Sequence, residues 1–122
     1  PQAAQVSASP YMYLVGMNAA AGSGEAELAQ FNEFYNTIHV PEVLTGYGFV
    51  SGARYKNMRT FLHPEPGAPN FLAMYGIKDE AAAHSFMKDR FSTDPGGNSF
   101  SAGPPPWQNR ETKWRLTYRL VG

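Results

Sequence analysis

The stretch YMYLVGMN, residues 11–18, constrains the fold of this chain more than any other segment. Its residues are rich in aromatic and aliphatic side chains, which is typical of a β-strand. Both alternating sets are apolar, with Tyr11, Tyr13, Val15 and Met17 on one side and Met12 and Leu14 on the other. A strand with apolar residues on both sides is covered on both faces of its sheet. The stretch therefore predicts a strand that needs a covering layer on each face.

A helix is predicted to follow, beginning at Ser23 or Gly24. Acidic residues in its first turn suit the positive end of the helix dipole. An apolar stripe recurs at spacings of three and four residues, formed by Leu28, Phe31, Tyr35 and Ile38. Pro41 biases Val40 away from helical geometry, so this helix is expected to stop near His39, with one short further turn after it.

The rest of the chain predicts three more strands and a second helix. The strands are expected at 48–58, 70–77 and 110–122, and the helix at 80–91, capped by Asp79. In the helix, Ala82, Ala83, Phe86 and Met87 are expected to face inward. In the strand 48–58, strict alternation groups Phe49, Ser51, Ala53 and Tyr55 on one face. Two segments rich in proline and glycine, 59–69 and 92–109, are predicted as loops.

The resulting order is strand, helix, strand, strand, helix, strand, which is the ferredoxin-like α+β arrangement. Its two helices would cover one face of a four-stranded antiparallel sheet. The other face would be exposed in a monomer, although the strands at 11–18 and 70–77 have no polar alternation that would tolerate water. A second copy packed sheet against sheet would cover it, so the pattern predicts a homodimer. We expect residues 1–10 to form a flexible arm and 11–122 to form a single domain.

Composition narrows the classes of partner. The chain has 122 residues, which fits one domain, and its 10 basic and 10 acidic residues give a formal net charge of zero. That balance argues against broad attraction to nucleic acid or to an anionic membrane. The chain has no cysteine, which excludes disulfides and thiolate chemistry and is compatible with a cytoplasmic protein. No apolar run approaches the length of a transmembrane helix, and the N-terminus does not resemble an intact signal peptide.

The segment FNEFYNTIHVPEVLTGYGFVSGARY, residues 31–55, resembles the dimeric α+β barrel superfamily and, within it, EthD-like proteins. The resemblance rests on an N-x-x-Y-x-x-x-H-x-P helix end, a Gly-Phe strand start and an Arg-Tyr pair. These residues are Asn32, Tyr35, His39, Pro41, Gly48, Phe49, Arg54 and Tyr55. The architecture extends over roughly residues 11–121. It implies a pocket between the sheet and its helices, but no particular substrate, because the superfamily includes isomerases, cyclases, cofactor-free monooxygenases and haem-degrading enzymes.

His39 is the leading candidate for a catalytic residue. It lies four residues after Tyr35, so the two side chains share one helix face and are expected to point toward the sheet. Burial lowers the pKa of an imidazole and a helix C-terminus raises it, so the balance could leave a neutral base near working pH. Such a group suits general acid/base chemistry. The alternative is that His39 only bonds a free carbonyl at the end of the helix.

The other candidates would stabilise or bind a substrate. Tyr35 or Tyr55 would donate a hydrogen bond to a developing oxyanion. The expected substrate-binding residues are Asn32, Arg54, Tyr75, His63 and Trp107. Each has a structural alternative: tyrosines are often core residues, and Trp107 could simply pin its loop. Arg54 could form an ion pair with an acid such as Glu42, and His63 could be exposed.

Several common kinds of site lack support in the sequence. The three histidines include no H-x-x-x-H or H-x-H pair, so no metal site is expected. Phosphate-binding glycine motifs and a G-x-S-x-G nucleophile motif are also absent. We therefore expect no cofactor.

Together these features predict a cofactor-independent enzyme that transfers protons on a small apolar molecule, aromatic or polyketide-like. The reaction would be of the cyclase, isomerase or lyase type. Two alternatives stay open: a cofactor-free monooxygenase acting on a phenol or quinol, and a non-enzymatic barrel that binds a small ligand. The sequence does not choose the substrate or the reaction among these.

Overall fold

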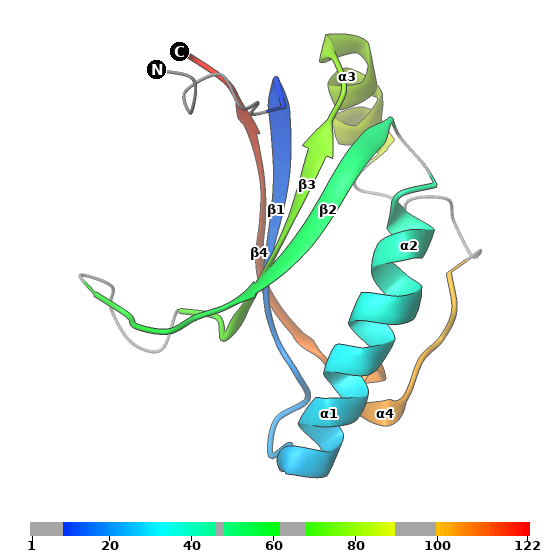
Figure 1. Cartoon of the computed structure of the whole chain (residues 1–122), viewed down its shortest axis with the longest axis vertical. Coiled ribbons are helices and arrows are strands. Elements are labelled where there is room, and N and C mark those ends of the chain that lie inside the picture. The colour runs from blue at the N-terminus through cyan, green and yellow to red at the C-terminus, as the bar shows by residue number, and fades with distance from the viewer. Residues whose placement is uncertain (1–8, 46–47, 62–67, 90–99) are drawn as a thin grey trace.

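A computed structural model of the chain describes residues 9–45, 48–61, 68–89 and 100–122 (Figure 1). The elements follow in the order β1 (Tyr11–Asn18), α1 (Glu25–Phe34), a π-helical segment η2 (Tyr35–His39), α2 (Val40–Val43), β2 (Phe49–Lys56), β3 (Phe71–Ile77), α3 (Glu80–Asp89), α4 (Pro105–Gln108) and β4 (Glu111–Arg119). The predicted strands and helices are all present. The short helix α4 was not predicted, and it begins where a proline at its first position is compatible with helical geometry.

The four strands form one antiparallel sheet in the order β2-β3-β1-β4. The two central strands, β1 and β3, are therefore not neighbours in sequence, and the crossover helices pack on the sheet. Figure 1 shows α1, α2 and α3 on the same side of the sheet. This arrangement confirms the predicted ferredoxin-like α+β fold.

The face of the sheet that meets the helices holds the aromatic core. Tyr13 in β1 packs against Phe49, Tyr75 and Phe86, with ring centroids 4.5–6.2 Å apart. Phe86 and Ala83 are fully buried, as predicted for the inner side of α3, whereas Met87 is exposed. The N-terminus of α3 is capped as expected, because Asp79 Oδ1 accepts a hydrogen bond from the Ala82 N–H at 2.8 Å.

The opposite face of the sheet is apolar. One row across it consists of Leu116, Leu14, Met74 and Ala53, each paired with the next on adjacent strands. Tyr118 and Tyr55 lie on the same face and are 55% and 54% exposed. No helix among the described residues covers this face (Figure 1).

The first helix does not stop at His39 as predicted. Val40 has helical φ and ψ of −58° and −48°, and the helix continues through Pro41 to Val43. The Val40 N–H bonds the Tyr35 carbonyl five residues earlier, which opens the helix by one residue. A proline ring normally clashes with the carbonyl four residues before it, and a π-turn relieves that clash. The preference of a pre-proline residue for extended geometry is overridden here.

The predicted grouping of side chains on β2 was also wrong. The pairing of β2 with β3 shifts register between Phe49 and Ser51, so two residues of β2 span one step of β3. Such a bulge interrupts the strict alternation of faces. Phe49 therefore lies on the helix side together with Arg54, while Ser51, Ala53 and Tyr55 lie on the open face.

Candidate functional site

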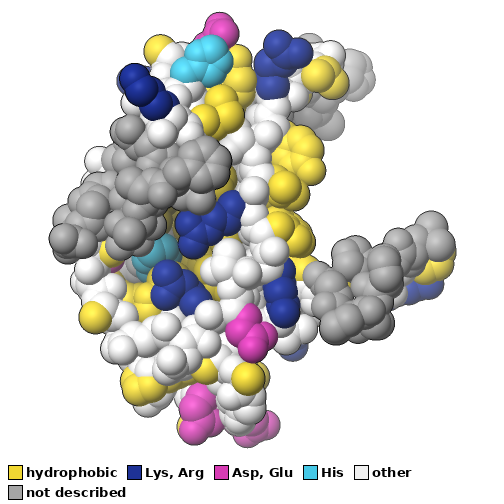
Figure 2. Space-filling view, turned by 180° about the vertical axis from the view of Figure 1, so that it is seen from behind, with side chains coloured by type: hydrophobic (Ala, Val, Ile, Leu, Met, Phe, Trp, Pro, Cys, Tyr) yellow, Lys and Arg dark blue, Asp and Glu magenta, His cyan; other side chains and the backbone are white. Residues whose placement is uncertain are grey.

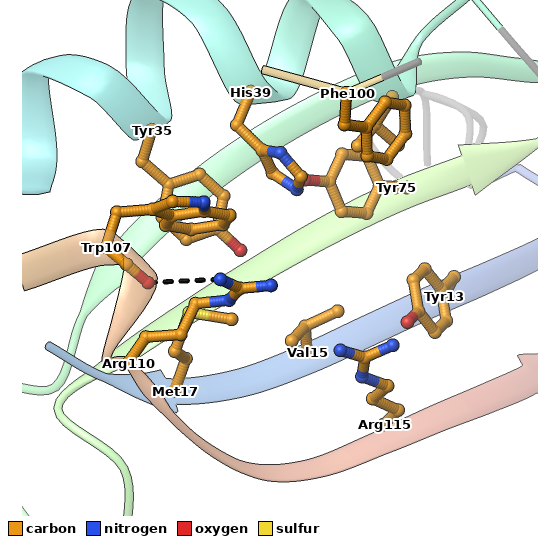
Figure 3. Close-up of a pocket in the computed structure, with 11 residues that line it drawn as sticks. Tyr13, Val15, Met17, Tyr35, His39, Tyr75, Phe100, Trp107, Arg110 and Arg115 are labelled. Atoms are coloured by element: carbon orange, nitrogen blue, oxygen red, sulfur yellow. Dashed lines mark hydrogen bonds between the residues drawn. The ribbon is translucent and has the colours of Figure 1, made fainter. Parts of the chain in front are cut away.

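A pocket lies between the helix end and the sheet, and its inner volume is about 40 Å³ (Figure 3). It is lined by Tyr13, Val15, Met17, Tyr35, His39, Val43, Tyr75, Phe100, Trp107, Arg110 and Arg115. In Figure 3, Tyr35 and His39 extend from the helix toward the sheet, and the two arginines lie opposite them. The volume is enough for roughly three ordered waters.

His39 lies on the helix side of this pocket, as predicted. Its ring is enclosed by aromatic side chains, with centroid distances of 5.4 Å to Tyr35, 4.4 Å to Trp107 and 5.2 Å to Phe100. Among the described residues, no group makes a hydrogen bond to its buried Nδ1. Its structural alternative, a bond to a free carbonyl at the helix end, is therefore not seen at Nδ1.

The imidazole of His39 is neutral at physiological pH. Its pKa is lowered to about 4, first by burial and then by the positive charge of Arg110, whose effect is larger than the opposite effect of the Glu42 carboxylate. The sequence suggested a balance between burial and the helix C-terminus, and in the structure burial dominates. A neutral ring with an unpartnered nitrogen can accept a proton.

The pKa of His39 makes the stability of the fold depend on pH. In the unfolded chain the imidazole takes up a proton near pH 6.5, whereas in the folded chain it does so only near pH 4. The unfolded state therefore binds more protons between these values, and stability is lost as the pH falls from 6.5 to 4. We expect a loss on the order of 3 kcal/mol, since the two pKa values differ by about 2.5 and one pKa unit corresponds to about 1.4 kcal/mol.

Chemical denaturation at a series of pH values measures this loss. The variant His39→Gln, which has no titrating ring at this position, should lose less stability over the same range. Equal losses in the two proteins would show that His39 is not the group responsible.

Tyr35 and Tyr75 supply hydroxyl groups to the same pocket. Both side chains are buried, at 2% and 1% exposure, and burial raises the pKa of each phenol. Each hydroxyl also contributes to the pKa of the other, so the two lie close together. Both phenols therefore stay protonated. Because a hydrogen bond joins the two hydroxyls, one of them donates to the other, and the remaining O–H can donate a hydrogen bond to an oxyanion.

The wall opposite His39 is cationic. Arg110 Nη1 donates a hydrogen bond of 3.0 Å to the Trp107 carbonyl, and its guanidinium lies 3.9 Å from the centre of the Trp107 ring. Arg115 comes from β4, where it is paired with Val15 of β1. Figure 2 shows basic side chains beside a histidine where this face of the molecule is hollowed. The pocket thus combines a neutral base, two phenols and two positive charges.

Arg54 does not form the predicted ion pair with Glu42. Its Nη1 and Nη2 donate hydrogen bonds of 2.9 Å to Asn36 Oδ1 and 2.8 Å to Asn32 Oδ1, and its guanidinium lies 4.1 Å from the centre of the Tyr35 ring. The Glu42 carboxylate instead accepts bonds from the Ser101 N–H and hydroxyl. The two asparagines, one helical turn apart, are therefore acceptors for Arg54. Together with Arg54 and Tyr55 they line a second, more open pocket, so the predicted role of Asn32 and Arg54 in substrate binding stays a prediction.

Removing one of these acceptors should destabilise the fold. We expect Asn32→Ala to lower the free energy of unfolding by about 1–3 kcal/mol, because a half-buried N–H of a charged group loses its partner. Urea denaturation measures the change. Gln30→Ala, at an exposed position of the same helix, is the control and should change stability little. Equal effects of the two substitutions would contradict a structural role for the Arg54 bonds.

Of the other predicted site residues, the structure places Trp107 at the pocket and Tyr55 on the opposite face of the sheet. Trp107 is 3% exposed and forms a wall of the pocket, packed on Phe34 and Tyr35. Tyr55 lies on the open face of the sheet, on the other side from His39, so the structure does not bring it to this pocket. The bulge in β2 is the reason. His63 lies outside the described residues.

Besides three aliphatic side chains, four aromatic or charged lining residues were not predicted as site residues: Tyr13, Phe100, Arg110 and Arg115. The alternation of side chains along a strand does place Arg115 on the opposite face from Trp114 and Leu116. However, a strand face rich in lysine and arginine is typical of a surface exposed to solvent. Arg115 reaches the pocket because β4 pairs with β1.

The described part of the chain shows neither a metal-binding cluster nor a membrane-spanning helix. No cluster of three or more His, Cys, Asp or Glu residues there is arranged to hold a metal ion. No helix in the same residues is long and apolar enough to cross a membrane.

Comparison with known proteins supports the fold. No protein-family model and no curated protein matches this chain. Among solved structures, the crystal structure of HapK from Hahella chejuensis is similar, with a TM-score of 0.53 over 92% of this chain and 93% of that one. The two sequences are 10% identical over this match, so the likeness concerns the fold alone. It agrees with the ferredoxin-like α+β fold expected from the sequence, and it does not test the resemblance to the dimeric α+β barrel superfamily or to EthD-like proteins.

Proposed function

We propose that this protein is a cofactor-independent enzyme that transfers protons on a small aromatic or polyketide-like molecule. The observation that carries the proposal is the neutral His39 ring, whose buried Nδ1 has no hydrogen-bond partner among the described residues. The motif in residues 31–55 supports placing the chain near EthD-like proteins as part of the same proposal.

The side chains of the pocket suggest how the reaction would proceed. His39 would remove a proton from a carbon next to a carbonyl, and the bonding electrons would move onto the carbonyl oxygen. The Tyr35 or Tyr75 hydroxyl would donate a hydrogen bond to that oxygen. Protonated His39 would then return the proton to another atom of the substrate, which completes an isomerisation, cyclisation or elimination.

The low pKa of His39 limits which substrates the enzyme could use. A base with a pKa of about 4 is weak, so it can remove only a proton that is already acidic. The protons between the two carbonyls of a 1,3-dicarbonyl compound meet this requirement. That chemistry is typical of polyketide-like molecules and favours them within the proposed class.

Exchange of substrate protons with deuterated water tests the proposal without knowledge of the natural substrate. Aryl ketones and aryl 1,3-diketones would be incubated with the protein, and loss of their α-proton NMR signals would be followed. We expect catalysed exchange at a rate that is constant above about pH 5 and falls as the pH drops through 4, because only the neutral imidazole is a base. Absence of catalysed exchange throughout the panel, or a midpoint near 6.5, would contradict the proposal.

The size of the pocket favours a second candidate function. A volume of about 40 Å³ does not hold an aromatic molecule unless its walls move. A non-enzymatic barrel that binds a small group is compatible with such a pocket. Ligand binding without any α-proton exchange would support this second function.

A further inference from the structure

Arg115 gives the pocket a charged group that the proposed proton transfer does not use. Its position on β4 opposite Val15 brings it to the pocket, and the side chain is itself exposed to water. In Figure 3 its guanidinium points toward the space between Tyr13 and Val15. The group is therefore reachable from solvent and directed at the interior.

No acid among the described residues forms an ion pair with Arg115. The ion pairs in this part of the chain join Glu80 to His84 and Glu111 to Lys113, and neither involves Arg115. Glu42, the acid whose charge acts on His39, accepts hydrogen bonds from Ser101. A guanidinium that faces a pocket and has no carboxylate partner among the described residues is suited to bind the carboxylate of a ligand through two parallel hydrogen bonds.

The size of the pocket indicates which part of a ligand enters it. An inner volume of about 40 Å³ accommodates a small polar head group but not a ring system. The apolar walls formed by Val15, Phe100 and Trp107 lie beside that space. A ligand would thus place its polar head inside and its apolar remainder against these side chains.

We infer that this site takes a small organic anion, an aromatic carboxylate or ionised enol, whose negative group binds at Arg115. The inference deepens the proposed function and rests on the same pocket being the site. Arg110 adds a second positive charge to the wall, held in place by Trp107. The bound negative charge lies across the pocket from His39, where it also offsets the positive charges that disfavour protonation of the ring.

Binding of two aromatic acids and their neutral amides tests this inference. Benzoate and phenylacetate would be compared with benzamide and phenylacetamide, by following the NMR signals of the His39 ring in the full chain. We expect the acids to bind with dissociation constants at least about 10-fold lower than those of the amides, since hydrogen bonds to charged groups are the stronger kind. The pKa of His39 should rise above its value of about 4 when an acid is bound.

Two arginine variants of β4 make the test specific. Arg115→Gln should weaken binding of benzoate about 10-fold, and Arg119→Gln should leave it unchanged, because Arg119 is exposed on the same strand, is paired with Tyr11, and does not line the pocket. Both positions are exposed, so both variants should keep the melting temperature of the wild type. Amides that bind as tightly as the acids, or benzoate binding that does not depend on Arg115, would overturn the inference.

The outcomes separate this inference from the proposed function. Arg115-dependent binding of the acids without any α-proton exchange would support the anion-binding inference and refute the proposed enzymatic function. Catalysed exchange of neutral diketones without binding of the acids would refute the anion-binding inference and support the proposed enzymatic function.

Discussion

Replacing His39 with glutamine is expected to reduce catalysed α-proton exchange by about 10²–10⁴-fold, the usual contribution of a general base. Glutamine is similar in size to histidine and can form hydrogen bonds, but it does not accept a proton at neutral pH. Tyr35, Trp107 and Phe100, which surround the ring, would keep their positions. The measurement is the exchange rate of the best aryl diketone, compared between the variant and the wild type at pH 7.

His84 provides the matched control for this substitution. It is an exposed histidine on α3, 3.8 Å from Glu80, and is not part of the pocket. His84→Gln should therefore keep the full exchange rate. If His39→Gln exchanged substrate protons as fast as His84→Gln, the proposed mechanism would be wrong even if the protein were shown to catalyse exchange.

The part of the site that the sequence predicted is the part set by helical periodicity. Tyr35 and His39 are four residues apart, so any continuous helix places them on one face. The helix continues beyond His39, but the two side chains still share a face, because the π-turn at Tyr35–His39 keeps both of them pointing toward the sheet. Strand order and fold class were predictable for the same reason: they depend on periodicity and element order, not on single contacts.

The parts that escaped prediction depend on register and on contacts between distant segments. One bulge in β2 moved Tyr55 to the open face and left Arg54 facing the helix. On that side Arg54 donates hydrogen bonds to Asn32 and Asn36, which lie 22 and 18 residues earlier. No local sequence pattern predicts contacts over such separations. Arg115 likewise reaches the pocket only through the pairing of β4 with β1. Such contacts are properties of the sheet rather than of any single segment.

The open face of the sheet raises the question of what covers it. We propose that a second copy of the chain does, as the sequence pattern predicted. Leu116, Leu14 and Met74 form an apolar row across the centre of this face, and Leu116 is 37% exposed in the single chain. A contiguous apolar sheet face of this kind is typical of an interface between subunits.

Replacing Leu116 with arginine should convert this dimer to a monomer, because sheet-to-sheet packing would bury an unpaired charge from each copy at the interface. Multi-angle light scattering should give twice the mass of one chain for the wild type and the mass of one chain for Leu116→Arg. Ile38→Arg is the control: Ile38 is a similarly exposed aliphatic residue, 41%, but it lies on the helix η2 rather than on the open face. Ile38→Arg should remain dimeric. A monomeric wild type would refute the proposed dimer. A dimeric Leu116→Arg would show that the two copies associate through another surface, so that the apolar row is not the interface between them.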